Sequence, residues 1–460
     1  MIETASFLYR FVCAFTRLGL VALLIPCAAP CQTFEWVASG GGAQSDKTRA
    51  VNVDRQGNVL LVGEVNGDAR FGEIVVSGAG NTDCLVAKVS PEGEFLWAKS
   101  LGGSLVDRGY GVAADAEGNL YVTGHHQSTD AKALGQPLPN AGDYDLFVAK
   151  YSPVGELLWV RTAGGSGYDY GHGIAVDSEG DIVVTGAVVG PAKFGETELT
   201  GTRPIFCAKY DASGRLLWVR GTEGKAACSG HGVALDAADN IYLGGLVSGT
   251  GNFAGRELNT GRETHALVAK LNSQGEVQWI STVPGAPSAV VHEITADAVG
   301  TVWVAGIFKG RLQAGNKSWT TTGEKDSDGW VAQFGTDGKL KWCQTLQGAG
   351  TDYLLGVAPN GSGGVLVAGE ASPGAILAGG QKLEGAARTS VLAASLDGSG
   401  ALQWHQVATG DKAGNAYTIV VDGKGTAVLG GAAMAPTDFG QVPMSATQGA
   451  DAYAVKVRLK

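Results

Sequence analysis

Seven tryptophans divide the chain into intervals of nearly constant length. Trp36, Trp97, Trp159, Trp218, Trp279, Trp342 and Trp404 follow one another at spacings of 61, 62, 59, 61, 63 and 62 residues. A repeat of this length, in which a single unit cannot bury its own apolar face, is typical of an array whose neighbouring units pack together. The spacing therefore predicts one structural unit written seven times.

The same order of short apolar runs and turns occurs in each unit. In the second unit, an Asp-x-x-Gly-Asn turn at 115–119 precedes the run LYVTG, and the turn Ser-Pro-Val-Gly at 152–155 precedes the run that carries Trp159. Runs rich in β-branched and aromatic residues between glycine turns indicate strands, and tight turns join antiparallel neighbours. We therefore expect each unit to be a four-stranded antiparallel meander.

Repeated meanders predict an all-β fold, a seven-bladed β-propeller, in which radial blades pack face to face. The chain ends with a third-strand run at 451–457, whereas residues 33–37 supply a lone fourth strand with Trp36. We expect this N-terminal strand to complete the last blade and close the ring, because closure removes exposed sheet edges. Residues 32–460 would then form a single propeller domain.

Residues 1–31 have the layout of a secretory signal peptide. Arg10 and Arg17 precede the apolar run at 18–25, and small residues follow up to Cys31. The apolar run is too short to span a bilayer. We predict cleavage after Cys31 and an extracytoplasmic location, with no transmembrane segment in the mature chain. Acylation of Cys27 or Cys31 is the alternative, although a proline before each cysteine makes a poor lipidation motif.

Charge and cysteine usage exclude several classes of function. The chain has a net charge of −10 and no basic stripe, which argues against nucleic acid or an anionic membrane as partner. Beyond residue 31, four scattered cysteines remain, Cys84, Cys207, Cys228 and Cys343. Their spacing fits neither a metal site nor a disulfide framework, so we expect small apolar core residues.

Residues 111–124 and 147–159 carry a longer pattern, Gly-x-x-x-Asp-x-x-Gly-Asn-x-Tyr-Val-x-Gly and later Phe-Val-Ala-Lys-Tyr-Ser-Pro-x-Gly-x-Leu-x-Trp. This pattern resembles the bacterial SBBP β-propeller repeat, and the resemblance extends over essentially the whole mature chain. It implies a propeller that is exported or attached to the cell surface. It carries over no catalytic residue.

One repeat position supplies the candidate binding site. Five residues before each turn aspartate stand Arg49, Tyr110, His172, His231, His292 and Tyr417, with Leu354 in the sixth unit, where we assign a degenerate turn to 359–364. This position lies near the start of the innermost strand, on the face of the long, variable connections. Such loops on a rigid scaffold commonly carry binding residues, so we expect a ligand site at the mouth of a central channel.

Three of these residues are histidines from consecutive units. Imidazoles brought together at His172, His231 and His292 could bind a divalent transition metal, which would act as a Lewis acid or activate a water molecule. The alternative, which we favour, is that the rings hydrogen-bond to the backbone and pack against one another.

A second column lies three residues earlier and contains aspartates, Asp46, Asp107, Asp169 and Asp352. Carboxylates at the channel rim could bind calcium or sugar hydroxyl groups, since hard cations prefer oxygen ligands. Aspartate also forms turns through hydrogen bonds to its own backbone, and we favour this second interpretation.

Familiar catalytic motifs are missing from the sequence, including the Gly-x-Ser-x-Gly elbow, His-Glu-x-x-His and the phosphate-binding loop. We therefore favour an exported, non-enzymatic binding or scaffold protein that recognises a protein or polysaccharide through its long-loop face. The alternative is a metal-dependent hydrolase or lyase that acts on an extracellular polymer at the central channel.

Overall fold

The computed structural model describes residues 32–323, 326–383, 389–410, 414–434, 437–440, 442–444 and 449–459. The predicted signal peptide at 1–31 lies outside these residues. Residues Gln32–Leu459 form one compact unit. Its described parts consist of strands and turns, which confirms the all-β prediction, and they contain no helix that could cross a membrane.

Antiparallel pairing groups the strands into meanders of four, as the turn spacing predicts. The first three are β2 (Lys47–Val53), β3 (Val59–Val65), β6 (Asp83–Val89) and β7 (Phe95–Leu101); β8 (Asp107–Ala114), β9 (Leu120–His126), β12 (Asp145–Tyr151) and β13 (Leu157–Ala163); and β14 (Tyr170–Val176), β15 (Ile182–Ala187), β18 (Ile205–Tyr210) and β19 (Leu216–Gly224).

The later groups follow the same order. They are β20 (Ala227–Leu235), β21 (Ile241–Phe253), β22 (Arg256–Leu271) and β23 (Val277–Val283); β24 (Gly285–Ala296), β25 (Val302–Ala314), β27 (Ser327–Phe334) and β28 (Leu340–Gln347); and β29 (Tyr353–Pro359), β30 (Val365–Ala371), β33 (Ser390–Leu396) and β34 (Leu402–Val407). In the last group, β36 (Gly414–Val421) and β37 (Thr426–Met434) are followed by β40 (Ala450–Arg458), which pairs with both β37 and the N-terminal strand β1 (Thr33–Gly42).

Short strands lie within most of the long connections between the second and third strands of a group. They are β4 (Ala69–Phe71), β5 (Ile74–Val76), β10 (Lys132–Ala133), β11 (Gln136–Pro137), β16 (Ala192–Phe194), β17 (Thr197–Leu199), β26 (Lys317–Thr320), β31 (Ile376–Leu377), β32 (Gln381–Lys382), β38 (Thr437–Phe439) and β39 (Val442–Pro443), with β35 (Thr409–Gly410) after β34. β4 pairs with the end of β1 and β31 with the end of β28. A connection of one group thus attaches to the outer strand of the group before it.

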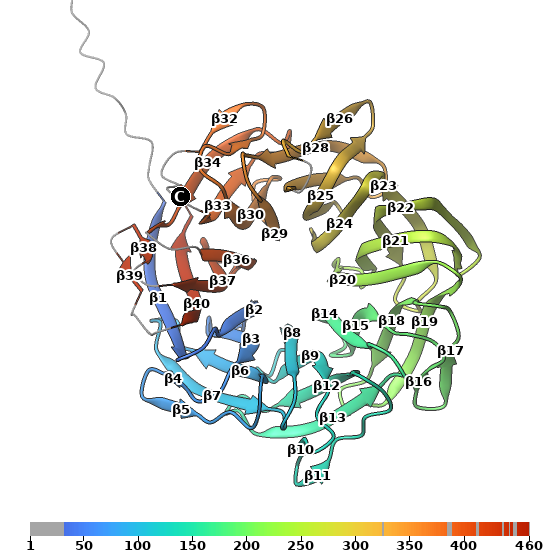
Figure 1. Ribbon diagram of the computed structural model, residues 1–460, viewed down its shortest axis with the longest axis vertical. Coiled ribbons are helices and arrows are strands. Elements are labelled where there is room, and N and C mark those ends of the chain that lie inside the picture. The colour runs from blue at the N-terminus through green and yellow to red at the C-terminus, as the bar shows by residue number, and fades with distance from the viewer. Residues whose placement is uncertain are drawn as a thin grey trace, which may run out of the picture. The chain divides into compact units, whose positions relative to one another are not determined.

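The groups follow one another around a common axis, with β2, β8, β14, β20, β24, β29 and β36 innermost (Figure 1). Hydrophobic clusters form between neighbouring groups rather than within one. Leu60 and Val62 pack with Leu120 and Phe147 of the next group, and a second cluster joins residues of β2 and β3 to residues of β37 and β40. This arrangement of radial sheets is a β-propeller fold.

All the repeat tryptophans except Trp404 contact the tight turn of the next group. Trp97 donates its indole N–H to the carbonyl oxygen of Pro153 at 3.2 Å, in the tight turn of the following group. The ring also covers Gly155, where φ is +81° and an added β-carbon would lie 2.8 Å from the indole. Trp36 makes the same contacts with Pro91 and Gly93. The glycine is therefore required both by the backbone conformation and by the neighbouring ring.

The turn aspartates of the inner hairpins are structural. Asp54 accepts hydrogen bonds from the backbone N–H groups of Gln56 and Asn58, and Lys88 on the third strand pairs with it at 2.9 Å. In the sixth unit, Asn360 makes the same turn bonds and contacts Ser395 at 3.2 Å. Asn360 therefore occupies the aspartate position, one residue later than predicted from Pro359. The lysine that pairs with the aspartate in the first unit is replaced by Ser395.

Substitution at the tryptophan contact provides a test of the fold. We expect Gly155→Ala to lower the free energy of unfolding by about 2 to 4 kcal/mol, because the new methyl group adds a collision with Trp97 to the strain of a positive φ. Gly180→Ala is the matched control, since φ is +85° there and nothing lies within 4 Å. Strain alone should cost about 1 kcal/mol. Equal losses in denaturant unfolding would contradict the proposed role of the tryptophan.

Candidate functional site

Each inner strand contains one residue that bulges out of the ladder at the position of the candidate column. The bulged residues are Arg49, Tyr110, His172, His231, His292, Leu355 and Tyr417. In the sixth unit the bulge holds Leu355 instead of the predicted Leu354, because the turn begins at Asn360. A bulge re-aims one side chain without ending the strand, which explains how these residues reach the axis.

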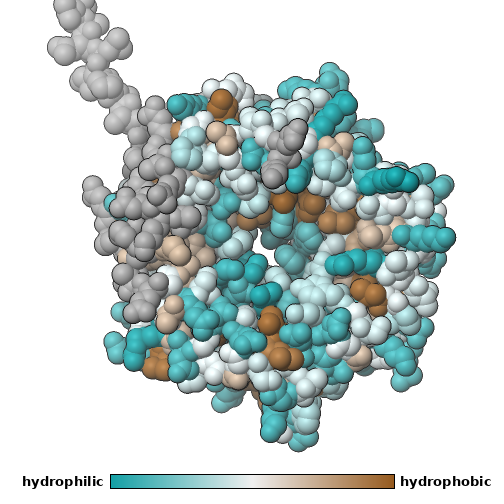
Figure 2. All heavy atoms as spheres, viewed as in Figure 1, coloured by the Kyte–Doolittle hydropathy of each residue, from teal (hydrophilic) through white to brown (hydrophobic). Residues whose placement is uncertain are grey.

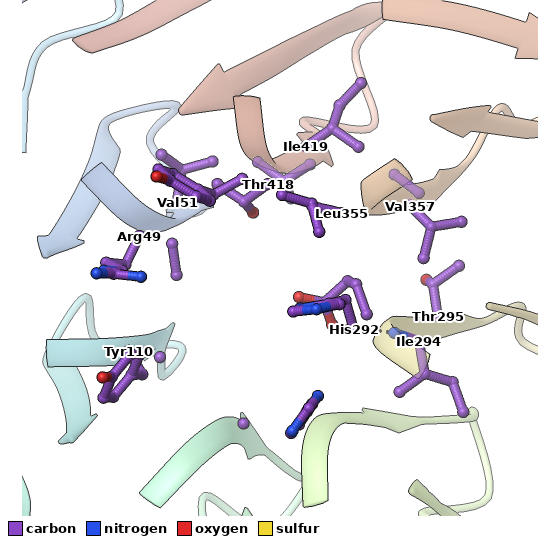
Figure 3. A pocket seen from close by; sticks show the side chains of 18 of the residues that line it. Arg49, Val51, Tyr110, His292, Ile294, Thr295, Leu355, Val357, Thr418 and Ile419 are labelled. Atoms are coloured by element: carbon purple, nitrogen blue, oxygen red, sulfur yellow. Dashed lines mark hydrogen bonds between the residues drawn. The ribbon is translucent and has the colours of Figure 1, made fainter. Parts of the chain in front are cut away.

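The bulged residues line one end of a cavity of about 520 Å³ along the axis. Beyond them the cavity wall contains one apolar β-branched residue from each inner strand: Val51, Val112, Ile174, Val233, Ile294, Val357 and Ile419. A hollow is visible at the centre of the molecule in Figure 2. In Figure 3, Arg49 and Tyr110 lie on one wall and His292 faces them across the cavity. We call the polar end the channel mouth and the β-branched ring the collar.

Flat side chains stack around the channel mouth. The guanidinium of Arg49 lies 5.4 Å from the ring centroids of both Tyr110 and Tyr417. Tyr110 stacks on His172 at 4.9 Å between centroids and 17° between ring planes. His172 and His231 follow at 5.1 Å, and His231 and His292 at 5.2 Å. The structure thus brings these residues together, but as a stack that runs around the mouth.

Hydrogen bonds fix the protonation of two imidazoles. Nδ1 of His172 lies 2.8 Å from the carbonyl oxygen of His231, and Nδ1 of His231 lies 2.9 Å from that of Val291. Since a carbonyl oxygen only accepts, each Nδ1 carries the proton and each Nε2 keeps its lone pair. Burial lowers the pKa of His231 to about 4 and that of His292 to about 3. The mouth therefore holds neutral imidazoles at physiological pH.

This arrangement does not fit the metal hypothesis well. The ring planes of His172 and His231 lie 30° apart in a stacked pair, and those of His231 and His292 lie 45° apart. Across the part of the chain that the structure describes, no group of three His, Cys, Asp or Glu side chains is arranged to hold a metal. Metal binding at His172, His231 and His292 stays a hypothesis for experiment.

Beside the mouth, the predicted residue Arg49 belongs to a cation cluster whose other members were missed by sequence reasoning. Glu64, which is 2% exposed, lies 3.0 Å from Nζ of Lys47, 3.2 Å from Arg49 and 2.7 Å from Nε of Arg108. Burial opposes ionisation of Glu64, but these three positive charges outweigh burial and lower its pKa. One carboxylate thus holds three cations together, and the cluster keeps an excess of positive charge. The contacts join separate strands, so no local sequence pattern reveals them.

Acidic residues line another part of the cavity. Burial raises the pKa of Glu293 on β24 to about 7, and burial together with Asp352 raises that of Glu370 on β30 to about 7. Glu293 follows the bulged His292, at a position filled elsewhere by Ala50, Gly111, Gly173, Gly232, Gly356 and Thr418. Aligning this position across the units would have singled it out.

The aspartate column supports loops. Asp46, Asp107, Asp169 and Asp352 are at most 1% exposed. Asp107 accepts hydrogen bonds from the backbone N–H of Gly103 at 2.8 Å and the hydroxyl of Ser128 at 2.6 Å. Asp46 likewise accepts from the N–H groups of Gly42 and Asn66. These bonds support the turn-forming interpretation, and they leave little of the carboxylates for a ligand.

Some of these aspartates face a second buried carboxylate. A β-carbon at Gly164 would lie 2.5 Å from Oδ1 of Asp145 and 2.8 Å from Oδ2 of Asp169, so both side chains approach one glycine. Oδ1 of Asp145 has no hydrogen-bond partner among the described residues. Burial, with a further contribution from Asp169, raises the pKa of Asp145 to about 6.

The SBBP β-propeller repeat matches residues 96–125 and 158–186, and together with the four-stranded meanders this makes the chain a β-propeller repeat protein. The chain is 25% identical over 237 residues to an uncharacterized WD repeat-containing protein of Acanthamoeba polyphaga mimivirus, covering 42% of this chain and 17% of that protein. It is 26% identical over 137 residues to the regulatory protein FlaEY of Caulobacter vibrioides, covering 28% and 14%. The chain thus spans less than a fifth of either relative.

A solved structure with a similar outline is the WD40 domain of Pan2 from Neurospora crassa. The two chains are 8% identical with a TM-score of 0.43, and the match covers 92% of this chain and 96% of that domain.

The Asp145–Asp169 pair predicts a pH-dependent stability difference. A raised pKa in the folded state means that stability falls as the pH rises from about 4 through about 6, because a buried carboxyl must ionise. We expect Asp145→Asn to unfold with a free energy about 1 to 3 kcal/mol above wild type at pH 7.5 and close to wild type at pH 4.5. Asp143→Asn, at an exposed position of the same loop, is the control. A pH-independent difference would contradict the prediction.

Elemental analysis tests the metal hypothesis. Because no three ligating side chains among the described residues are arranged to hold a metal, we expect residues 32–460 to carry no stoichiometric zinc or manganese after incubation and dialysis. A variant with alanine at His172, His231 and His292 should have the same metal content. About one ion per chain, lost in the folded variant, would establish the metal site.

Proposed function

We propose that the chain is an exported, non-enzymatic, seven-bladed β-propeller that binds anionic groups of a polysaccharide or protein through its long-loop face. Export is inferred from the leader at 1–31 and a bacterial origin from the resemblance of the repeats. Ring closure is supported by the pairing of β40 with β1. It is also supported by a backbone hydrogen bond from Asp46 to Ala450, at 2.7 Å, that repeats the bond from Asp107 to Thr82 at 2.8 Å.

The cation cluster around Glu64 is the observation that carries the binding proposal. Lys47, Arg49 and Arg108 have side chains that are 30%, 23% and 33% exposed, so their charges are held in place but remain accessible. The chain as a whole has a net charge of −10. A local excess of positive charge on such a molecule attracts anionic groups to one place, and guanidinium groups bind carboxylates and phosphates with defined geometry.

Aromatic rings beside this cluster suit a polymer ligand. Tyr144 and Tyr168 meet edge to face at 4.5 Å between ring centroids, and both rings lie about 5 Å from that of His125. Both tyrosines are partly exposed in the connections that lead into β12 and β14. Tyrosine offers a rigid apolar face with a polar tip, which is suited to sugar rings and to protein surfaces.

The stacked imidazoles favour binding over catalysis at the same site. His172 and His231 each use one nitrogen on a neighbouring carbonyl, and burial keeps their pKa well below the range of an effective general base at neutral pH. These two hydrogen bonds hold the imidazole rings in place at the channel mouth. A preorganised surface loses less conformational entropy when it binds a ligand.

Two arginines offer a matched test of the face. We expect Arg108→Gln to weaken binding to a polyuronate or to an acidic protein about tenfold, because a charge-assisted hydrogen bond contributes roughly 1.5 kcal/mol. Arg55→Gln, on an exposed arginine of the tight-turn face, should change affinity less than about twofold. Calorimetry at two salt concentrations would measure both. Equal losses in the two variants, or no binding of any polyanion, would refute the proposal.

A further inference from the structure

Opposite walls of the central cavity carry opposite charge. Arg49 reaches the channel mouth from β2, whereas Glu293 belongs to β24, which lies across the axis in Figure 1. The neutral imidazoles of the channel mouth lie between them along the wall. A molecule in the cavity therefore meets a cation on one side and a carboxyl group on the other.

Arg49 keeps donors available for a ligand. Its Nη2 group donates to both carboxylate oxygens of Glu64 at 3.2 Å, whereas its Nη1 group donates to none of the described residues, and the side chain is 23% exposed. Lys47 and Arg108 also pair with Glu64, so this single carboxylate does not neutralise Arg49 alone. An anionic group near Arg49 would satisfy unused donors and compensate the excess charge.

Glu293 lacks a cationic partner among the described residues. Oε1 of Glu293 accepts only the backbone N–H of Ile294, at 3.1 Å. Its carboxyl lies against the adjacent inner strand, where a β-carbon at Gly232 would be 2.9 Å from Oε1. A carboxylate in such a place is stabilised when an opposite charge joins it, and Glu370 lines the cavity nearby without an ion pair in the described structure. Burial raises the pKa of both groups to about 7, and Asp352 contributes to the shift at Glu370.

Below these charges the collar presents apolar side chains to the cavity. Its side chains, represented by Val51, Ile294 and Ile419, are at most 8% exposed and enclose the axis on all inner strands. A cavity of about 520 Å³ is in the range of small-molecule sites, which run from about 300 to 1,000 Å³. Polar groups at the mouth and an apolar ring below define both the composition and the orientation of the ligand.

We propose that the central cavity binds a small amphoteric molecule that has a carboxylate, a protonated amine and an apolar body, the class of an apolar amino acid. Arg49 binds the carboxylate, Glu293 binds the ammonium group, and the apolar body enters the collar. This proposal rests on the proposed function in that it takes the channel mouth as the entrance. The two proposals differ in the residues they use. The small ligand contacts Glu293 and the collar, whereas a polymer bound to the long-loop face contacts neither.

Calorimetric titration of residues 32–460 with leucine and phenylalanine tests the proposal. Each is compared with its N-acetyl derivative, which lacks the cation, and its amide, which lacks the carboxylate. We expect both derivatives to bind at least tenfold more weakly than the parent amino acid. No measurable binding of either amino acid would overturn the proposal, and so would equal affinity for parent and N-acetyl compounds.

Variants assign the two charges to their residues. Glu293→Gln and Arg49→Gln should each weaken amino-acid binding at least tenfold, and Glu293→Gln should cause no further loss for the N-acetyl compounds. Glu179→Gln, on the tight-turn face, is the matched control and should bind as wild type. Glu293→Ala guards against misfolding, because alanine and glycine occupy this position in other units. Full amino-acid affinity in both Glu293 variants would overturn the assignment.

The polymer experiment separates this proposal from the proposed function. Glu293→Gln should leave polyuronate binding unchanged, and Arg108→Gln should leave most amino-acid affinity in place. If the wild-type protein binds the polyuronate but binds neither amino acid, the cavity proposal alone is refuted. Amino-acid binding without any polyanion binding would refute the polymer proposal and keep the cavity.

Discussion

The contact between a repeat tryptophan and the next tight turn, made by all of them except Trp404, sets the geometry on which the rest of the molecule depends. A single meander has two faces to cover and cannot cover them alone. Trp97 places its ring on Gly155 and its N–H on Pro153, so the next meander has one position and one tilt. The hydrophobic clusters then fill the space between neighbours. Repetition of this contact is what brings the inner strands to a common axis.

Convergence at the axis creates both the site and its restrictions. Inner strands approach so closely that a β-carbon at Gly111 would lie 2.5 Å from the carbonyl oxygen of His172. Most units therefore have glycine or alanine at this position, and the bulge carries the larger side chain just before it. The rings that emerge stack instead of converging on a point, and this favours recognition over metal chemistry. Charge is then added unevenly, with cations beside β2 and β8 and carboxyl groups beside β24 and β30.

The sequence predicted whatever depends on local spacing. Turn motifs and apolar runs gave the meanders, and the tryptophan period gave their number and order as an expectation. Counting five residues back from the turn gave the wrong residue in the sixth unit. Asn360 is the turn residue there, so the bulged residue is Leu355 instead of Leu354. Glu64, Lys47 and Arg108 were missed because the cluster joins separate strands, with Arg108 reaching Glu64 from the following unit. Glu293 was missed because it stands out only when this position is aligned across the units, where the other residues are small.

Because of the bulges, the side chains at the axis can change during divergence of the repeats without a change in strand pairing. A bulged residue shares no ladder pairing of its own, as the register across Gly109 and Gly111 shows for Tyr110. Replacing such a residue alters the chemistry of the axis while strand pairing and the tryptophan contacts persist. Arginine, tyrosine, histidine and leucine already occupy equivalent bulges in this one chain. Relatives with the same repeat can therefore acquire new ligands by point substitution, one unit at a time, on an unaltered scaffold.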